Sequence, residues 1–245
     1  EFHPVFPTLN PSQDIIISAL QAFTKKDSVD PQELAEAASS QIKKEIIAAD
    51  FGLTGAGSIV AENGVIVLAE NQGDVRAVSN LPYRHIVIAG IDKIIESAED
   101  AISLLQAYYI CSTNSIAPAY VSLIGGPSRT ADIEFKMAYG MHGPKEVHVI
   151  LLDNGRSKLA ATPACTLLTC TECGNCYDFC RMLAAKNDWS NTTLTPKALA
   201  LALMRGELSG KIDGNGLPDI TCNLGFTKDD IINHLNSIWQ MANNK

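Results

Sequence analysis

The chain has 245 residues, 46% of them hydrophobic and 19% charged, so it can bury the core of one large domain or of one domain with a small appendage. Its formal net charge of −8 argues against a nucleic-acid backbone as the main partner, because phosphate binding needs clustered lysine and arginine side chains. The sequence contains no apolar run of roughly 20 residues and no signal-peptide pattern at its start, so we expect a soluble, cytoplasmic protein without a membrane span.

Five segments carry the signals of a helix start: a residue that can cap the helix, followed by proline or by an acidic or amide side chain. Asn10 precedes Pro11 in the first segment, and Asp30 precedes Pro31 in the second. The predicted helices cover residues 11–23, 31–49, 97–110, 195–206 and the stretch from 227 toward the end.

Short runs rich in valine and isoleucine lie between the early helices and predict strands. They are SIVA (58–61), VIVLAE (65–70), HIVIAG (85–90), YVSLIG (120–125) and VHVILLD (147–153). Asn63-Gly64 predicts a hairpin turn after the first strand, because Asn-Gly tolerates positive φ at both central positions. Continuous apolar strands mixed with helices indicate an α/β fold whose sheet is covered on both faces.

The β pattern disappears after Pro163, and the remaining sequence combines cysteines, helices and a glycine-rich connector. We therefore expect a domain boundary near Thr162. Residues 1–162 would form an α/β domain with leading helices, and residues 163–245 a small helical region that contains the cysteine loop.

Four of the seven cysteines follow the spacing C-x2-C-x2-C-x3-C, namely Cys170, Cys173, Cys176 and Cys180. Two-residue gaps allow a short loop to present three thiolates to three irons of a cubane, whereas structural zinc sites usually separate two C-x2-C pairs by a dozen or more residues. The spacing predicts one [4Fe–4S] cluster. The fourth ligand is either Cys180 or the remote Cys222, and a second cluster is not expected.

Two longer stretches, residues 49–95 and 125–156, resemble the core of the LUD (lactate-utilisation) domain family, and the resemblance continues into the cysteine run. It is strongest to the iron–sulfur subunits of three-component L-lactate oxidation systems. Compared with those subunits, this chain is shortened and has only one complete cysteine motif. The resemblance implies a fold similar to the sugar-isomerase and CoA-transferase α/β superfamily, and a role in oxidising lactate to pyruvate with other subunits.

Three residues are candidates for catalysis. Glu62 lies in an Ala-Glu-Asn-Gly turn, which resembles the turn that carries the nucleophilic glutamate of CoA-transferases, although it could equally be a solvent-exposed turn residue. Arg76 could bind a small carboxylate through bidentate hydrogen bonds, or form a surface ion pair with Glu70 or Asp74. His142 could act as a general acid or base, or be an ordinary loop histidine.

The cysteine motif favours an electron-transfer subunit of an oxidoreductase complex. The resemblance implies other subunits as partners and a small carboxylate as substrate. One alternative is a CoA-transferase-like enzyme that uses Glu62 and has a structural metal. Another is a non-catalytic scaffold stabilised by metal. The loop GGPSRTAD (125–132) follows a strand and is a weaker candidate for ligand binding.

Overall fold

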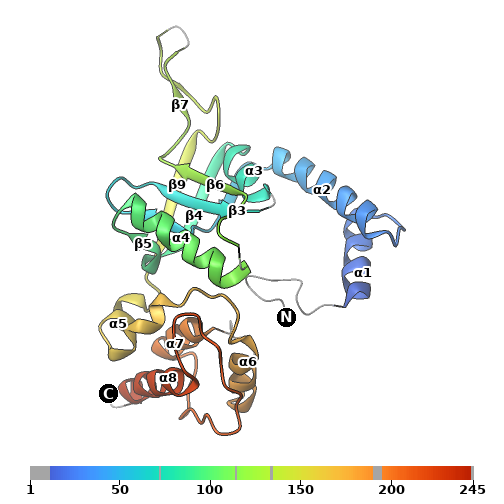
Figure 1. Cartoon of the computed structure of the whole chain (residues 1–245). Coiled ribbons are helices and arrows are strands. Elements are labelled where there is room, and N and C mark those ends of the chain that lie inside the picture. Colours follow the sequence, from blue (N-terminus) through green and yellow to red (C-terminus); the bar gives the residue numbers. More distant parts are fainter. Residues whose placement is uncertain (1–11, 72, 114, 133–134, 190–194, 244–245) are drawn as a thin grey trace.

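The computed structural model describes residues 12–71, 73–113, 115–132, 135–189 and 195–243. Three parts follow one another along the chain: a pair of N-terminal helices, an α/β body with a projecting hairpin, and a C-terminal group of helices (Figure 1). The architecture is mixed α/β, as the sequence predicts, and one of its sheets is parallel.

The N-terminal helices α1 (Gln13–Thr24) and α2 (Pro31–Ala48) pack against each other and lie to one side of the body (Figure 1). The predicted cap of α2 is confirmed, because Asp30 Oδ1 accepts a hydrogen bond from the backbone N–H of Gln32 at 2.9 Å. Such a bond satisfies one of the N–H groups that have no partner within the helix. The expected Asn10–Pro11 cap of α1 lies outside the described residues.

Two sheets form the body. The first is parallel with the order β1-β4-β9, and the second is mixed with the order β5-β2-β3-β6. Their strands are β1 (Phe51–Thr54), β4 (Arg84–Gly90), β9 (Glu146–Leu152), β5 (Ile94–Ile95), β2 (Ser58–Val60), β3 (Ile66–Glu70) and β6 (Tyr120–Ile124). All five predicted strands are therefore confirmed, and β1 and the short β5 are additional.

The predicted hairpin joins β2 to β3, which pair antiparallel. Gly64 has a φ of +73°, but Asn63 is not among the residues with positive φ, so the expectation of positive φ at both positions is wrong here. The Asn63 side chain instead accepts a hydrogen bond from the backbone N–H of Val65 at 3.0 Å. The turn thus combines the left-handed glycine and this side-chain bond with backbone hydrogen bonds from Gly64 N–H to Val60 O and from Val60 N–H to Val65 O.

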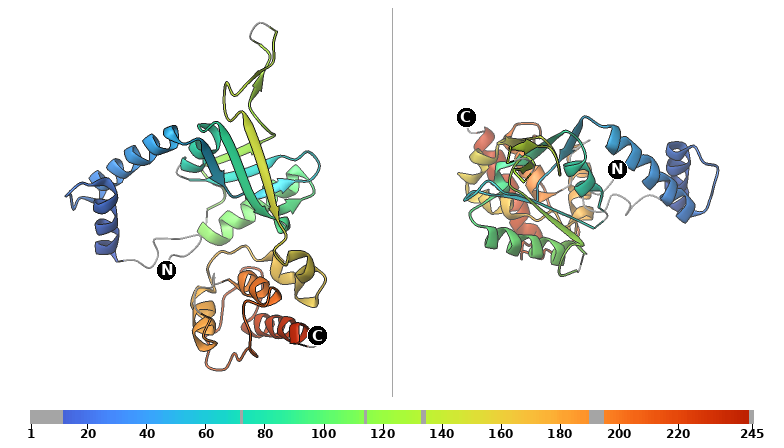
Figure 2. Two further views of the ribbon diagram at one scale, coloured as in Figure 1. Left: turned by 180° about the vertical axis from the view of Figure 1, so that it is seen from behind. Right: turned by 90° about the horizontal axis from the view of Figure 1, so that it is seen from above.

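The expectation that the sheet is covered on both faces is wrong for β9. The side chains of residues 149–152 are 41–47% exposed. Helix α3 (Asp74–Asn80) packs on β1 and β3, and helix α4 (Ala98–Thr113) packs on β2 and β5. Strand β9 is at the edge of its sheet, and no described helix lies in front of it when the molecule is seen from behind (Figure 2).

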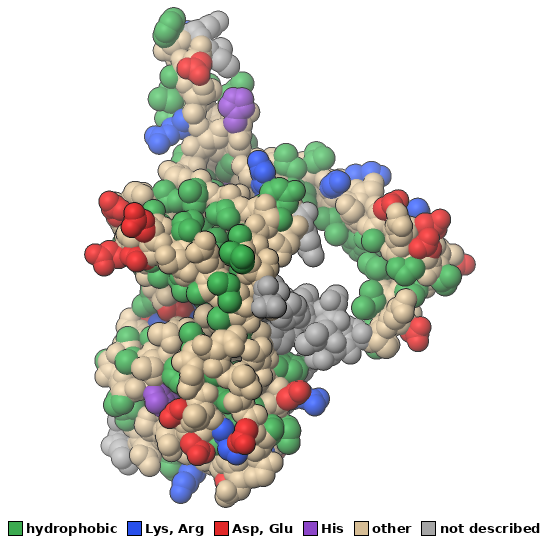
Figure 3. Space-filling view, in the orientation of Figure 1, with side chains coloured by type: hydrophobic (Ala, Val, Ile, Leu, Met, Phe, Trp, Pro, Cys, Tyr) green, Lys and Arg blue, Asp and Glu red, His purple; other side chains and the backbone are tan. Residues whose placement is uncertain are grey.

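The opposite face also carries exposed hydrophobic side chains, which gather over the body in Figure 3. Helix α4 has exposed Ile102 and Ile110, and strand β6 has exposed Leu123. Acidic side chains cluster at the left edge of this face (Figure 3). Above it, β7 (Arg129–Thr130) and β8 (Ala138–Tyr139) form a hairpin that projects away from the sheets (Figure 1).

The C-terminal helices share one hydrophobic core. They are α5 (Arg156–Ala160), the 3-10 helix η2 (Pro163–Thr169), α6 (Tyr177–Lys186), α7 (Pro196–Met204) and α8 (Lys228–Asn243). Leu159 of α5 is fully buried in this core with Leu167 and Leu199. Burying each such leucine contributes about 2 kcal/mol from the apolar area it removes from water. By its packing, α5 belongs to the group of C-terminal helices, although it precedes Thr162, near which the sequence predicts the domain boundary.

Within the part of the chain that the structure describes, no helix is long and apolar enough to cross a membrane.

Candidate functional site

The cysteine loop connects η2 to α6. Thr162 caps η2 by accepting a hydrogen bond from the N–H of Ala164, and η2 ends where Cys170 begins the loop. Two residues of the loop then have a positive φ, Glu172 with +57° and Gly174 with +88°. Glycine tolerates this conformation, whereas a glutamate there is uncommon and marks a locally constrained backbone.

Four cysteines line one small pocket between this loop and the segment 221–226. They are Cys170, Cys173, Cys176 and Cys222. Cys180 does not line the pocket: it lies in the first turn of α6, is fully buried in the helical core, and has its Sγ 3.9 Å from that of Cys176. The remote Cys222 therefore shares this pocket with three cysteines of the motif, whereas Cys180 lies against Cys176 from the side of the helical core.

Burial perturbs the thiols. It raises the pKa of Cys170 to about 11, although a hydrogen bond from the backbone N–H of Glu172 acts in the opposite direction. The Cys180 thiol donates to Cys176, which lowers the pKa of Cys176, and the same bond together with burial raises the pKa of Cys180. A backbone N–H directed at a cysteine sulfur is an interaction that also tunes iron–sulfur clusters.

The donor set and the Glu172 N–H fit an iron–sulfur cluster, but the space between the thiols is about 20 Å³, roughly enough for one water molecule. A cluster would therefore have to displace the thiol side chains that now fill the pocket. Among the residues that the structure describes, no group of three or more His, Cys, Asp and Glu side chains is arranged to hold a metal ion.

An ionic cluster connects the cysteine loop to the α/β body. Asp92, in the 3-10 helix η1 (Ile91–Lys93) after β4, pairs with Arg156 of α5 and with Lys197 of α7, whose Nζ lies 3.2 Å from Asp92 Oδ2. Lys197 also lies 3.3 Å from Glu172 Oε1. The side chains of Lys197 and Asp92 are only 3% and 4% exposed, so their ion pair is buried, whereas the Glu172 side chain that joins Lys197 to the loop is 37% exposed.

The charges in this cluster stabilise one another. Burial by itself would raise the pKa of Asp92, but attraction by Lys197 and Arg156 outweighs burial and holds that pKa below its ordinary value. Burial would likewise lower the pKa of Lys197, and attraction by Glu172 and Asp92 raises it instead. Opposite charges at short distance favour the ionised forms in this way.

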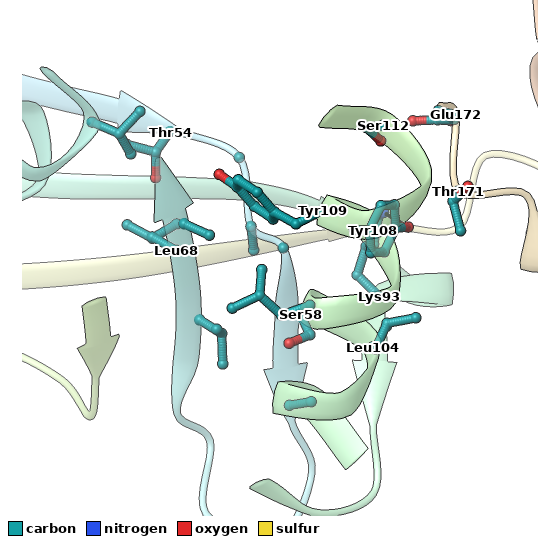
Figure 4. Close-up of a pocket in the computed structure, with 18 of the residues that line it drawn as sticks. Thr54, Ser58, Leu68, Lys93, Leu104, Tyr108, Tyr109, Ser112, Thr171 and Glu172 are labelled. Carbon is teal, nitrogen blue, oxygen red and sulfur yellow. Dashed lines mark hydrogen bonds between the residues drawn. The ribbon is translucent and has the colours of Figure 1, made fainter. Parts of the chain in front are cut away.

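A cavity of about 640 Å³ lies in the body, between the sheets and α4, and extends to the cysteine loop. Figure 4 shows Tyr109 projecting between α4 and β3, with Thr54 and Leu68 on one side and Thr171 and Glu172 at the other end. Thr171 and Glu172 are the residues between Cys170 and Cys173, so the cavity and the cysteine pocket share a wall. Its volume is typical of sites for small molecules.

The three candidate catalytic residues do not converge, and none of them lines this cavity. Glu62 is exposed in the hairpin turn, and its backbone N–H donates to Glu96 O. The Arg76 guanidinium lies 5.9 Å from the ring centre of Tyr120, and Glu70 caps α3 by accepting from the N–H groups of Val75 and Arg76.

His142 is in the projecting loop region, where its backbone N–H donates to Ser128 Oγ at 3.0 Å. The GGPSRTAD stretch leads into the same projection and does not reach the cavity either. The two cysteines outside these groups, Cys111 and Cys165, are both partly exposed.

The sequence interpretation missed Lys197 and Asp92. Lys197 lies in the first turn of α7, after the capping residue Thr195 and Pro196. It is the one charged residue in the otherwise apolar helix sequence PKALALALM, and this was the available signal of a buried ion pair. Asp92 lies two residues after the end of β4, at the edge where α/β folds place functional groups.

The sequence model of the LUD domain matches residues 14–152. The chain is 30% identical to lactate utilization protein B of Shouchella clausii over 219 residues, which cover 88% of this chain and 44% of that protein. It is also 30% identical to lactate utilization protein B of Geobacillus kaustophilus, over 73% of this chain and 36% of that protein. The chain thus spans less than half the length of these relatives.

A crystal structure of a DUF162 family protein from Deinococcus radiodurans resembles part of the fold, with a TM-score of 0.31 and 24% identity over 44% of this chain and 57% of that one. The family match covers more than half of the chain, together with both sheets of the body. The chain therefore belongs to the LUD domain family.

Proposed function

We propose that the chain is an iron–sulfur electron-transfer subunit of a cytoplasmic oxidoreductase complex that acts in lactate utilisation or on a related 2-hydroxy acid. The relatives' names support the pathway. The observation that carries the electron-transfer role is the shared pocket of Cys170, Cys173, Cys176 and Cys222, which adjoins the large cavity of the LUD domain. All seven cysteines are unpaired, which is in keeping with a reducing compartment.

The residues that would hold a [4Fe–4S] cluster are Cys170, Cys173 and Cys176, with Cys222 as the fourth ligand. Cys222 is preferred over Cys180 because it lines the same pocket, while the Cys180 side chain is buried among apolar residues of the helical core. The bound group would supply one-electron transfer with little rearrangement of its ligands.

The residues of this chain would contribute the surroundings of the group. The Glu172 N–H faces the Cys170 sulfur, and the buried Lys197 places a positive charge beside the loop through Glu172. Oxidation of a hydroxy acid to a keto acid releases two electrons and two protons, so a partner subunit or a further cofactor is part of the proposal. We also propose that the fold relation to the sugar-isomerase and CoA-transferase superfamily, implied by the resemblance, applies to the body.

The test is anaerobic purification followed by visible absorption and by iron, sulfide and zinc analysis. We expect a brown protein with about four irons and four sulfides per chain. Cys170→Ala and Cys222→Ala should each lose most of the iron, whereas Cys180→Ala should retain it. Cys165→Ala, at a cysteine of η2 that does not line the pocket, is the matched control and should behave like the unaltered protein.

A colourless protein that contains zinc and no iron would refute the proposal. Loss of iron in Cys180→Ala but not in Cys222→Ala would still support a cluster in this chain, but would show that its fourth ligand is Cys180 rather than Cys222.

A further inference from the structure

The large cavity has the shape and chemistry of a site for a ligand bigger than lactate. Since water occupies about 30 Å³ per molecule, the cavity of about 640 Å³ holds roughly 20 water-sized groups. A three-carbon acid would leave most of it filled with water. Its wall consists largely of aliphatic side chains, including Leu53, Leu68, Val75, Leu104 and Leu105.

The charges in the wall also disfavour a small carboxylate. Lys93 is the one cationic residue among the described residues that line the cavity, and its ammonium is already 2.6 Å from the hydroxyl of Tyr108 and 4.6 Å from the centre of that ring. Asp74 and Glu172 add two carboxylates. A ligand with little or no negative charge fits this balance better than an anion does.

The wall does offer a hydrogen-bond donor, which His85 positions. His85 is fully buried on β4; its Nε2 lies 2.8 Å from Thr54 Oγ1, and its Nδ1 has no partner among the described residues. Burial lowers the pKa of His85, which favours the neutral ring. We assign the ring proton to Nε2, because a buried N–H without an acceptor is rarer than a buried lone pair without a donor.

With this tautomer, His85 donates to Thr54, and the hydroxyl proton of Thr54 is available to an acceptor in the cavity (Figure 4). A carbonyl oxygen of a ligand is such an acceptor. Tyr109 lies beside Thr54 in the same space and provides an aromatic surface on which a flat ring can pack.

We propose that this cavity binds a planar, largely apolar aromatic redox carrier with ring carbonyl groups, of the quinone or flavin type. The inference rests on the proposed function insofar as the carrier would lie beside the cysteine loop, where Thr171 and Glu172 form the common wall. Binding itself needs only the cavity, and can be measured whether or not the chain holds a cluster.

The experiment is calorimetric titration of the full chain with two uncharged probes: a dimethyl-naphthoquinone that lacks the ring position to which thiols add, and riboflavin, a flavin without phosphate. Saturable binding of either probe supports the inference, and the stronger binder identifies the source. L-lactate should neither bind nor displace the probe. The iron-free Cys170→Ala chain should bind equally well, which separates this inference from the cluster proposal.

Two pairs of variants locate the site. Leu104→Trp fills the cavity and should weaken binding at least tenfold, whereas Ile102→Trp, on an exposed position of the same helix, should leave it unchanged. Thr54→Val removes the donor and should weaken binding roughly fivefold, the usual effect of one hydrogen bond, while Thr54→Ser retains it.

Absence of binding by both probes would overturn the inference. So would binding that Leu104→Trp leaves unchanged, or displacement of the probe by L-lactate.

Discussion

Replacement of Lys197 by methionine tests whether the ionic cluster holds the cysteine loop and the C-terminal helices to the body. The substitution keeps an unbranched side chain but removes the ammonium that lies between Asp92 and Glu172. Removing one member of a buried ion pair typically costs 3–5 kcal/mol, because the other charge remains buried without compensation. Since Asp92 keeps Arg156 as a partner, we expect the lower end, about 3 kcal/mol.

Urea unfolding at neutral pH, followed by tryptophan fluorescence, measures this loss. Trp189 is 8% exposed and packs in the core of the C-terminal helices, so its emission reports on their unfolding. In thermal unfolding, the same loss corresponds to a decrease in Tm of about 6–12 °C for a protein of this size.

The double variant Lys197→Met/Asp92→Asn is the control. It removes both charges, and should be at least about 1 kcal/mol more stable than the sum of the two single effects predicts. The role assigned to the Lys197–Asp92 pair would be refuted if the two single substitutions lowered the unfolding free energy additively. A loss of unfolding free energy below about 1 kcal/mol for Lys197→Met would refute it as well.

The effect of Lys197→Met should depend on pH. The pKa of Asp92 is lowered in the folded protein, so its ion pairs stabilise the fold fully above the unfolded value of about 4, and this stabilisation is lost as pH falls through the lowered folded pKa. The difference in unfolding free energy between the unaltered chain and Lys197→Met should therefore shrink in acid. A difference that stays constant down to acid unfolding would show that the Asp92 charge is not involved.

Three further substitutions test the fold by urea unfolding. Thr195→Ala should cost about 1 kcal/mol, because Thr195 Oγ1 accepts from the N–H of Ala198 at the start of α7, and Thr195→Ser should be nearly neutral. Gly52→Ala should cost more than about 4 kcal/mol or prevent folding, since the added Cβ would lie 1.9 Å from the carbonyl oxygen of Val78. Gly64→Ala should cost only about 1 kcal/mol, because its φ is +73° but the space around it is open; equal losses at both glycines would contradict the clash.

Much of the local structure follows from the sequence because short-range bonds decide it. Asp30, Thr195 and Thr227 start helices as predicted, since each side chain accepts or exchanges bonds with groups two or three residues later. Strand β1 was missed because Gly52 interrupts a four-residue run, and its strand character depends on pairing with β4 more than thirty residues later in the chain.

The candidate site likewise has one part that the local sequence determines and another that only the tertiary structure determines. The spacing of Cys170, Cys173 and Cys176 is a property of one loop and can be read from the sequence. Tertiary structure alone brings Cys222 to that loop, turns Cys180 into the helical core, and places Asp92 against Lys197. These arrangements depend on the packing of elements distant in sequence, where burial and charge compensation, rather than local pattern, determine which side chains meet.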